Sequence, residues 1–347
     1  MGITLHRILI DQDMMIFYKY QGAGNDFLIA DNRDGHITEN EGLLTAVLED
    51  GTLWQRSIES LCDRRYGVGA DGLMLLEAGR PIAECRPIAD GRPIADGRPE
   101  TEKLTATEDR SMSPDQSTDF QMVYFNSDGS GGMMCGNGGR CIVAFAKDCG
   151  VEGETDNDGI KKYIFTAADG LHEAYVLEDT PMGKTIRLKM KDVDEYQAYE
   201  TLTGVNVPSE GYFLDTGTRH YVRFVDNLEE YDIVSEGRDI RYNAVELQPI
   251  GANVNYVEPC GGALKVRTYE KGVEDETFAC GTGIVASALA SYIKGADPSV
   301  TDSDSRLYYN IRAKKDRLAV DFIPESNGLA NDIHLTGPAA FVCKIEI

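Results

Sequence analysis

The sequence has little that suits a disulfide-built or membrane-spanning protein. Eight cysteines in 347 residues are too few for a disulfide scaffold, and no two are spaced as Cys-x-x-Cys. A zinc ribbon or a thioredoxin-like motif therefore has no support, and we predict no metal site. No apolar run approaches the length of a transmembrane helix, and the first residues do not form a secretory signal. We expect reduced thiols, a cytoplasmic location and no membrane partner.

Basic residues are also scarce. The chain has 34 Lys and Arg against 58 Asp and Glu, which gives a formal net charge of −24. This charge disfavours binding to a nucleic-acid backbone, so we expect no nucleic-acid partner. The excess of acidic residues is most simply a solvated surface. The 42% of apolar residues suffice for a core, and the length of the chain suggests two domains.

One motif occurs twice, and the rest of the chain is arranged around it. Cys-Gly-x-Gly stands at residues 135–138 and again at residues 280–283. Each copy precedes a run of small and apolar residues with helical character, at 142–147 and 284–290. Each motif therefore predicts a cysteine at the start of a helix, where unpaired N–H groups and the helix dipole favour negative charge.

A helix start lowers the pKa of a thiol and can hold a carboxylate beside it. A single cysteine is more often a buried, inert thiol, so either motif alone gives weak support. Two matched cysteines favour chemistry, because one thiolate can remove a proton from carbon while the other thiol delivers one to the opposite face. We therefore predict that Cys135 and Cys280 invert a stereocentre. This reaction needs no cofactor, and nothing in the chain resembles a pyridoxal-binding lysine.

Both halves of the chain follow one plan of short strands, the cysteine motif and a helix that is apolar on nearly every face. Such a helix is buried, so we expect a sheet to wrap around it. The sequence predicts an α/β (α+β) fold of two pseudo-symmetric domains, each a curved short-stranded sheet around a central helix, with the active site in the cleft between them. The patterns predict strands at residues 16–20, 27–30, 120–125, 163–167, 173–177, 185–190, 212–225 (two strands and a turn), 250–257, 264–272, 318–322 and 341–347, and a helix at 53–62.

Three segments do not fit this plan. Residues 80–100 repeat a six-residue unit that begins Arg-Pro-Ile-Ala, and a polar tail follows, so we expect a disordered insertion at about residues 79–118. Residues 1–14 are expected to be an appendage. Residues 67–72 match G-x-G-x-x-G, but they precede a strand-like run instead of opening a helix. We therefore reject dinucleotide binding.

In combination, the motifs resemble those of the diaminopimelate epimerases. The resemblance extends from about Met15 to Ile347, apart from the insertion, and rests on residues 22–27, 66–72, 125–129, 135–141 and 279–283. It implies a first domain of residues 15–189 and 336–347 and a second domain of residues 190–335, so that the last strand returns to the first domain. It also implies interconversion of LL- and meso-2,6-diaminopimelate for lysine and peptidoglycan precursor biosynthesis.

The resemblance assigns roles to individual residues. Cys135 and Cys280 would be the catalytic acid/base pair, and His220 and Glu270 would tune their pKa values. The backbone N–H groups of Gly136, Asn137, Gly281 and Thr282 would hold the reacting carboxylate, and Glu270 would bind the α-amino group. The distal end of this small amino acid substrate would be bound by Asn25, Asn126, Asn253, Thr218 and Lys271.

The chain departs from the common family pattern at three places, which the resemblance puts in distal recognition. Thr218-Arg219-His220 stands for Asn-Pro-His, Glu270-Lys271 stands for Glu-Arg, and Gly72 stands where some members have glutamine. These departures leave open a racemase or isomerase of another amino acid. A thiol-redox or ligand-binding protein on the same fold is a further alternative. The family is often dimeric through the C-terminal strands, so the resemblance also implies a homodimer, with Cys343 where some members have tyrosine.

Overall fold

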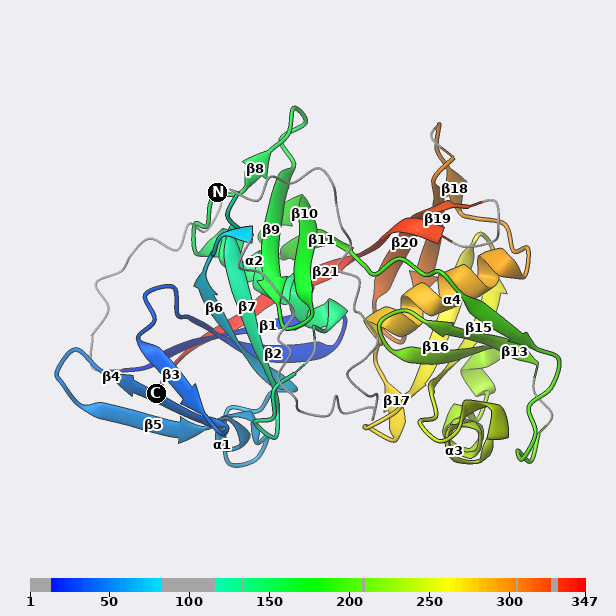
Figure 1. The fold of residues 1–347 in the computed structure, drawn as a ribbon, viewed down its shortest axis with the longest axis horizontal. Helices are drawn as coiled ribbons and strands as arrows, with labels where there is room; N and C mark the ends of the chain where they lie inside the picture. The colour runs from blue at the N-terminus through cyan, green and yellow to red at the C-terminus, as the bar shows by residue number, and fades with distance from the viewer. Residues whose placement is uncertain (1–13, 83–115, 133, 208–209, 304, 326–329) are drawn as a thin grey trace. The chain divides into compact units, whose positions relative to one another are not determined.

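The computed structural model describes residues 14–82, 116–132, 134–207, 210–303, 305–325 and 330–347 (Figure 1). These residues form two compact units. Unit 1 contains the described residues up to Leu188 together with Pro338–Ile347, and unit 2 contains Lys189–Gly337. Residues 1–13 of the predicted appendage and residues 83–115 of the predicted insertion lie outside the described residues.

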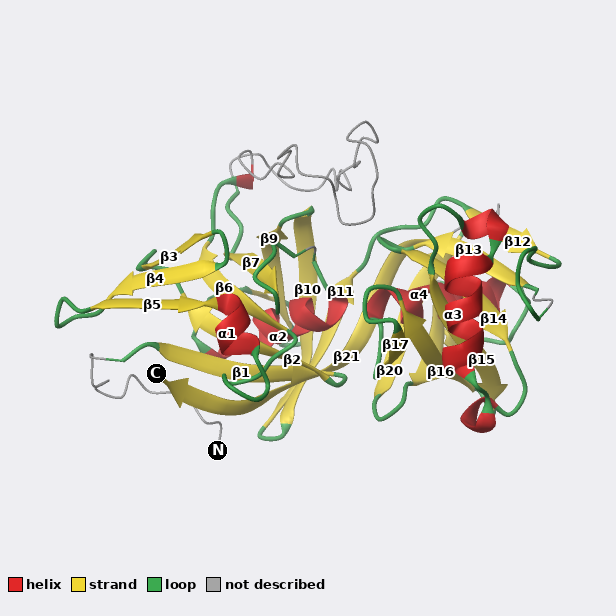
Figure 2. Ribbon diagram, turned by 90° about the horizontal axis from the view of Figure 1, so that it is seen from below, coloured by secondary structure: helices red, strands yellow, loops and turns green. Residues whose placement is uncertain are grey.

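Unit 1 is built mainly from strands, as Figure 2 shows. Its main sheet runs in the order β21–β1–β2–β6–β7–β9–β10–β11, and β11 also pairs with β21, so the sheet closes into a barrel. A separate small sheet consists of β3, β4 and β5. The elements are β1 Ile16–Gly22, β2 Asn25–Asp31, β3 Ile37–Asn40, β4 Leu43–Val47, β5 Leu53–Ser57, α1 Ile58–Cys62, β6 Gly72–Ala78, β7 Phe120–Asn126, α2 Gly136–Asp148, β8 Glu154–Thr155, β9 Lys161–Ala167, β10 Gly170–Thr180 and β11 Gly183–Lys189.

Unit 2 has its own sheet, which runs in the order β12–β13–β14–β15–β16–β19–β20–β21. The short strands β17 and β18 pair with β16 and β19. The elements are β12 Tyr196–Tyr199, β13 Gly211–Asp215, β14 Arg219–Phe224, α3 Ile233–Asn243, β15 Asn253–Cys260, β16 Ala263–Glu270, β17 Asp275–Thr277, α4 Gly281–Ile293, β18 Val300–Thr301, β19 Leu307–Arg312, β20 Arg317–Pro324 and β21 Ala330–Glu346, with 3₁₀ turns at Leu228–Glu230 and Val245–Leu247.

The two units repeat one topology. From β1 to β11 the successive strand pairs are antiparallel, parallel, antiparallel, parallel, antiparallel and antiparallel. From β13 to β21 the pairs follow the same order of directions. The predicted mixed α+β fold with an internal repeat is therefore confirmed, and β2, β6 and β7 of unit 1 correspond to β14, β15 and β16 of unit 2.

The central helices α2 and α4 also correspond. α2 contacts β1, β2, β6, β7 and β10, whereas α4 contacts the equivalent strands β13, β14, β15, β16 and β20. All residues of α2 from Gly136 to Ala146 are buried, and so is almost all of α4, as the apolar pattern predicted. Both helices begin directly after the cysteine, as the motifs predicted, and the apolar runs at 142–147 and 284–290 are their later parts. The glycines of the first turns have a low helix propensity, so composition alone marks only those later parts.

The long strand β21 completes both sheets. Its first part pairs with β20 from Ala330 to Thr336, and its last part pairs with β1 from Ala340 to Glu346. The prediction of a strand at residues 341–347 located only the end of this 17-residue strand. The return of the chain to unit 1, which the family resemblance implied, is present in the pairing of β21 with β1.

One local prediction needs correction. Residues 53–62 are not one helix, because Leu53 and Gln55 are exposed while Trp54 is buried, which is the alternation of a strand paired to β4. The helix begins only after Ser57, whose side chain accepts a hydrogen bond from the N–H of Ser60 at 3.2 Å and caps α1. Gly72 starts β6, which confirms that this glycine motif precedes a strand instead of opening a helix.

The edges of the predicted insertion are paired rather than loose. The N–H of Thr118 donates to the carbonyl of Arg80 at 2.9 Å, and the N–H of Ile82 donates to the carbonyl of Gln116 at 2.8 Å. These bonds extend the antiparallel pairing of β6 and β7. The predicted limits of 79 and 118 were therefore too wide by a few residues on each side.

Candidate active site

Cys135 and Cys280 occupy the same position in the two units. Each is the N-cap residue of its central helix, with extended backbone angles (φ −108°, ψ 129° for Cys135; φ −94°, ψ 114° for Cys280). The first helical hydrogen bonds run from the N–H of Gly139 to Cys135 at 2.7 Å and from the N–H of Ile284 to Cys280 at 2.8 Å. The N–H groups of the residues that directly follow each cysteine, Gly136 and Asn137 in α2 and Gly281 and Thr282 in α4, lie at the positive end of the helix dipole.

The surroundings of both helix starts suit an anion. The first turns of α2 and α4, both described in full, contain no acidic residue. Each cysteine is partly buried, and the residue after it, Gly136 or Gly281, is buried. A helix N-terminus with these properties can hold a carboxylate and stabilise a thiolate beside it.

In unit 1, the start of β2 is joined to the first turn of α2. Nδ2 of Asn137 donates to Oδ1 of Asn25, and Nδ2 of Asn25 donates to Asp71 at 3.1 Å. Asp71 also accepts from the N–H of Asp26 at 3.1 Å. Arg140, which is fully buried, donates from Nη2 to Oδ1 of Asn137 at 2.8 Å. The structure therefore brings the predicted residues Asn25 and Asn137 into direct contact.

Asn126 ends β7 at the same edge of the unit 1 sheet. It stands opposite Gly72 in the antiparallel register, and its Nδ2 donates to Oγ of Ser130 at 3.0 Å. A Cβ on Gly72 would lie 2.6 Å from the ring of Tyr124 and from the carbonyl of Phe125. Tyr124 therefore fills the space that a longer side chain at position 72 would need.

In unit 2, four predicted residues converge beside the start of α4. Oγ1 of Thr282 lies 2.9 Å from Nε2 of His220, 3.0 Å from Oγ1 of Thr218 and 3.4 Å from Sγ of Cys280. Oγ1 of Thr218 also lies 2.9 Å from Nε2 of His220. Thr218, which the resemblance put at the distal end of the substrate, thus contacts the residues next to Cys280.

His220 is fully buried in this cluster. Burial lowers its pKa to about 3, because the charged imidazolium loses its hydration, and the nearby Asp215 offsets only part of this effect. The ring is therefore neutral at physiological pH. A neutral imidazole has one donor and one acceptor nitrogen, so the partners of its two nitrogens fix where the proton lies.

The remaining predicted residues of unit 2 lie at the start of β15 and the end of β16. Asn253 accepts at Oδ1 from the N–H of Lys271 at 2.9 Å and donates from Nδ2 to the carbonyl of Arg219 at 3.1 Å. Glu270 ends β16, as Asn126 ends the equivalent strand β7. The side chains of Glu270 and Lys271 are partly exposed. Asn253 thus holds the Lys271 turn against the start of β14.

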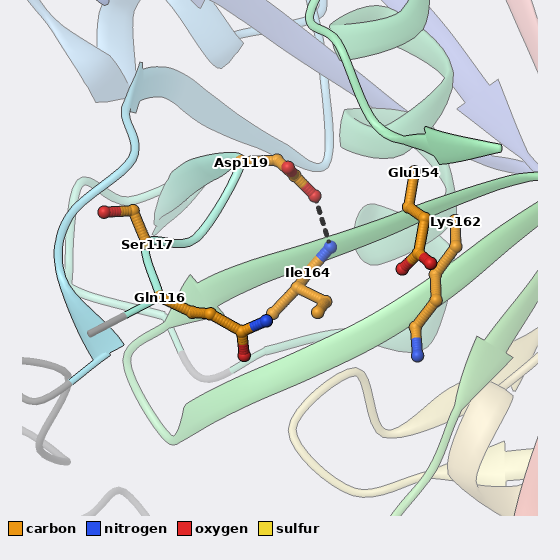
Figure 3. A pocket seen from close by; sticks show the side chains of 6 residues that line it. All are labelled: Gln116, Ser117, Asp119, Glu154, Lys162 and Ile164. Carbon is orange, nitrogen blue, oxygen red and sulfur yellow. Dashed lines mark hydrogen bonds between the residues drawn. The ribbon is translucent and has the colours of Figure 1, made fainter. Parts of the chain in front are cut away.

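A cavity of about 190 Å³ in unit 1 is separate from these residues. Figure 3 shows its lining, in which Asp119 accepts a hydrogen bond from the N–H of Ile164 at 2.7 Å. Burial raises the pKa of Asp119. Asp119 immediately precedes β7, whereas Asn126 ends it, so the cavity lies at the opposite end of this strand from the predicted site.

The sequence did not reveal two buried polar residues of the site. Arg140 lies within the first cysteine motif, and its charge inside an apolar helix was the signal that could have marked it. Asn255 is two residues from Asn253 and therefore on the same face of β15. A second asparagine on the buried face of a strand was a signal that it has polar partners.

The fold of this chain is also found in solved structures, among which are proteins described as a racemase and an epimerase. The structure resembles a phenazine biosynthesis protein of the PhzF family from Bacillus anthracis, with a TM-score of 0.59, 13% identity and coverage of 96% of this chain and 99% of that one. It also resembles a probable proline racemase from Agrobacterium radiobacter, with a TM-score of 0.58, 14% identity and coverage of 96% and 92%. A hydroxyproline epimerase from Agrobacterium vitis gives a TM-score of 0.55 at 13% identity, with coverage of 97% and 93%. These similarities show the fold.

Closer relatives identify the family. The chain is 38% identical over 335 residues to the diaminopimelate epimerase of Flavobacterium psychrophilum, which covers 96% of this chain and 100% of that protein. It is 35% identical to the diaminopimelate epimerase of Chlorobaculum tepidum, with coverage of 93% and 97%. The chain therefore belongs to the diaminopimelate epimerase family and is an isomerase of the amino acid epimerase type. A search against protein-family models gave no match. In the described part of the chain, every helix is too short or too polar to cross a membrane.

Proposed function

We propose that the protein interconverts LL- and meso-2,6-diaminopimelate in lysine and peptidoglycan precursor biosynthesis, by proton transfer between two cysteines. The observation that supports this most is the equivalence of Cys135 and Cys280. Each caps the buried central helix of its unit at the same point of a repeated topology. Inversion at one carbon by two groups requires an acid/base on each face, because one proton leaves from one face and another arrives at the opposite face, and two matched thiols can fill these two roles.

The proposed step conserves every proton. In one direction the thiolate of one cysteine removes the α-proton and becomes a thiol, and the electron pair is left on the α-carbon and its carboxylate. The thiol of the other cysteine then gives its proton to the opposite face and becomes a thiolate. The enzyme ends with the two protonation states exchanged, and the reverse reaction restores them. Helix N-termini that hold the carboxylate stabilise the charge that develops during this transfer.

The proposed substrate contacts divide into two groups. The amides of Gly136, Asn137, Gly281 and Thr282 hold the reacting carboxylate, and Glu270 binds the α-amino group. Asn25, Asn126, Asn253, Thr218 and Lys271 recognise the distal amino acid end. The contact of Thr218 with Thr282 favours a second role for Thr218 beside the reacting end.

Incubation of the purified protein with LL-diaminopimelate in D₂O tests the proposal. We expect deuterium at one α-carbon and the appearance of the meso isomer, measured by mass spectrometry after chiral separation. Cys135→Ala and Cys280→Ala should each abolish epimerisation, because inversion needs both thiols. A correctly folded protein that incorporates no deuterium would contradict the proposal.

A panel of other amino acids in the same assay tests the substrate. The departures at Thr218, Arg219 and Lys271 are the reason to include proline, hydroxyproline and monocarboxylic amino acids. Deuterium uptake into one of these, with none into diaminopimelate, would keep the epimerase class and replace the substrate. The thiol-redox alternative predicts the opposite pattern, in which no amino acid is labelled and the cysteine variants change only oxidation behaviour.

A further inference from the structure

One buried residue of the site has no role in the reaction described above. Asn255 lies on β15 and is fully buried, directly behind His220. Its Nδ2 lies 3.0 Å from Nδ1 of His220, and its Oδ1 accepts a hydrogen bond from Oγ1 of Thr268 at 2.9 Å. A buried amide of this kind is costly unless its polar atoms are paired, so its placement behind His220 calls for an explanation.

The partners of Asn255 fix which way its amide points. Nδ2 also faces the carbonyl of Tyr221, at 3.5 Å. A carbonyl can only accept, so the atom that faces it must be the NH₂ group and not the oxygen. Oδ1 is then left for Thr268, whose hydroxyl donates. In this orientation Asn255 presents a donor to Nδ1 of His220.

The orientation of Asn255 determines the tautomer of His220. Nδ1 must accept from Asn255, so the proton of the neutral ring lies on Nε2. Nε2 then donates toward the hydroxyls of Thr282 and Thr218, both 2.9 Å away. A Thr282 oxygen that accepts from its neighbours has its own proton available for Sγ of Cys280, 3.4 Å away.

We infer that Asn255 is a positioning residue, which holds His220 as a neutral donor so that the hydroxyl of Thr282 donates to the thiolate of Cys280. The inference rests on the proposed function in one respect, since it takes Cys280 as a cysteine that must carry negative charge. His220 acts in this arrangement without gaining or losing a proton. Hydrogen bonds to a charged acceptor are among the strong ones in proteins, so Thr282 stabilises the thiolate form of Cys280.

The packing around Asn255 supports this role. A Cβ on Gly283 would lie 2.3 Å from Oδ1 of Asn255 and 3.2 Å from Cε1 of His220. The first turn of α4 therefore approaches both side chains as closely as a glycine allows, and it leaves them little room to rotate. Burial also lowers the pKa of His220 to about 3, which agrees with a ring that stays neutral.

The tautomer of His220 is the first test. Long-range ¹H–¹⁵N spectra of the full-length protein distinguish a proton on Nε2 from one on Nδ1, and loss of a signal in His220→Gln assigns the residue. We expect the Nε2–H form in the wild type. Asn255→Asp replaces the donor with an isosteric acceptor and should put a proton on Nδ1. A wild-type ring protonated on Nδ1, or an unchanged ring in Asn255→Asp, would overturn the inference.

The second test follows the thiol of Cys280. The rate of iodoacetamide alkylation is measured against pH, and mass spectrometry of the separated peptides distinguishes Cys280 from Cys135. The midpoint is the pH at which the alkylation rate reaches half of its maximum. Thr282→Val should raise this midpoint for Cys280 by about one pH unit, because the thiolate loses one charge-assisted hydrogen bond. Thr282→Ser keeps the hydroxyl and should keep the midpoint. Cys135, in the other unit, is the internal reference.

The effect of Asn255 on Cys280 completes the experiment. In Asn255→Asp the midpoint for Cys280 should shift by at least about half a unit, upward if the ring is neutral and downward if it becomes an imidazolium. The spectrum of the same sample says which form is present. Equal midpoints for Thr282→Val and Thr282→Ser, or no shift in Asn255→Asp, would overturn the inference. Neither readout needs substrate, so these results are independent of whether diaminopimelate is epimerised.

Discussion

Nη2 of Arg140 lies 2.8 Å from Oδ1 of Asn137, one turn earlier on α2. The same guanidinium donates to the carbonyls of Gly136 at 3.2 Å and Pro338 at 3.3 Å, and its side chain is fully buried. Arg140 thus fixes the amide of Asn137, whose other end donates to Asn25. Asn137, in the first turn of α2, is thus held by a charged side chain. Thr282, in the first turn of α4, is instead contacted by the neutral ring of His220, which Asn255 contacts in turn.

Replacement of Arg140 by methionine should destabilise the protein by about 2–4 kcal/mol, because buried acceptors lose their donors. Urea denaturation measures this, and Arg65→Met is the matched control. Arg65 is exposed, so its replacement should change stability by no more than about 0.5 kcal/mol. A stability of Arg140→Met equal to that of the control would show that the three hydrogen bonds contribute nothing net.

Gly283→Ala should lower the catalytic activity more than it lowers the stability of the fold. The added methyl would lie 2.3 Å from Oδ1 of Asn255 and must displace the amide or the helix. We expect a loss of about 1–3 kcal/mol in stability and a fall in kcat/KM of at least about tenfold. Gly131→Ala is the control, since a Cβ there has no described atom within 4 Å. The prediction fails if both variants retain full activity.

The stability of the protein should fall with acid in a way that His220 explains. Its pKa in the folded state is about 3, below the ordinary value of 6.5, so the unfolded chain takes up the proton first as the pH falls. The effect is absent above about pH 6.5 and grows by up to about 1.4 kcal/mol for each pH unit below it, until about pH 3.

Comparison with His220→Gln isolates this contribution. The variant lacks the buried imidazole, so its unfolding free energy should fall less steeply as the pH drops from 6.5 to 5. The difference in slope corresponds to about one fewer proton taken up on unfolding. Other titrating groups are common to both proteins and cancel in the difference. Parallel pH profiles for the two proteins would contradict the prediction, because they would mean that His220 has the same pKa in the folded and unfolded states.

Lys271 should matter for binding more than for turnover. If Lys271 binds the distal carboxylate as proposed, Lys271→Met removes the charged partner of that group, so we expect KM for diaminopimelate to rise by about tenfold or more and kcat to change less. Lys271→Arg should keep or lower KM, since a guanidinium binds a carboxylate through two hydrogen bonds. Steady-state kinetics with both variants decide this. A KM of Lys271→Met equal to that of the wild type would remove Lys271 from substrate recognition.

The sequence predicted the elements that have a clear period or composition. The strands β1, β7 and β9 alternate in burial over part of their length, and β2 is a short run of consecutive buried residues. The central helices are apolar on nearly all sides, so the local pattern sufficed for these elements. β3 and the short strands β17 and β18 are too polar or too short to show a pattern. β4 alternates in burial, with Leu44 and Ala46 buried, but no strand was predicted there. The helix at residues 53–62 was wrong in its first half because the pairing of β5 with β4 overrides helical spacing.

The candidate site also has one part that the sequence predicted and another part that it did not. The position of Cys135 and Cys280 at helix starts could be predicted because their motifs are local. The support for His220 could not, because Asn255 and Thr268 are 35 and 48 residues further along the chain and only the register of β14, β15 and β16 brings them together. A polar residue in a strand does not reveal its partner until the pairing of the strands is known.

The path of β21 has a consequence for how the chain is made. Unit 2 is a continuous stretch of sequence, whereas the barrel of unit 1 needs β1, which pairs from Ile16, and the end of β21, which pairs up to Glu346. Chains grow from the N-terminus, so the sheet of unit 1 stays open while all of unit 2 leaves the ribosome. The unpaired edge of β1 is exposed to other chains throughout this period. The half of the protein that is translated first is thus the half that is completed last.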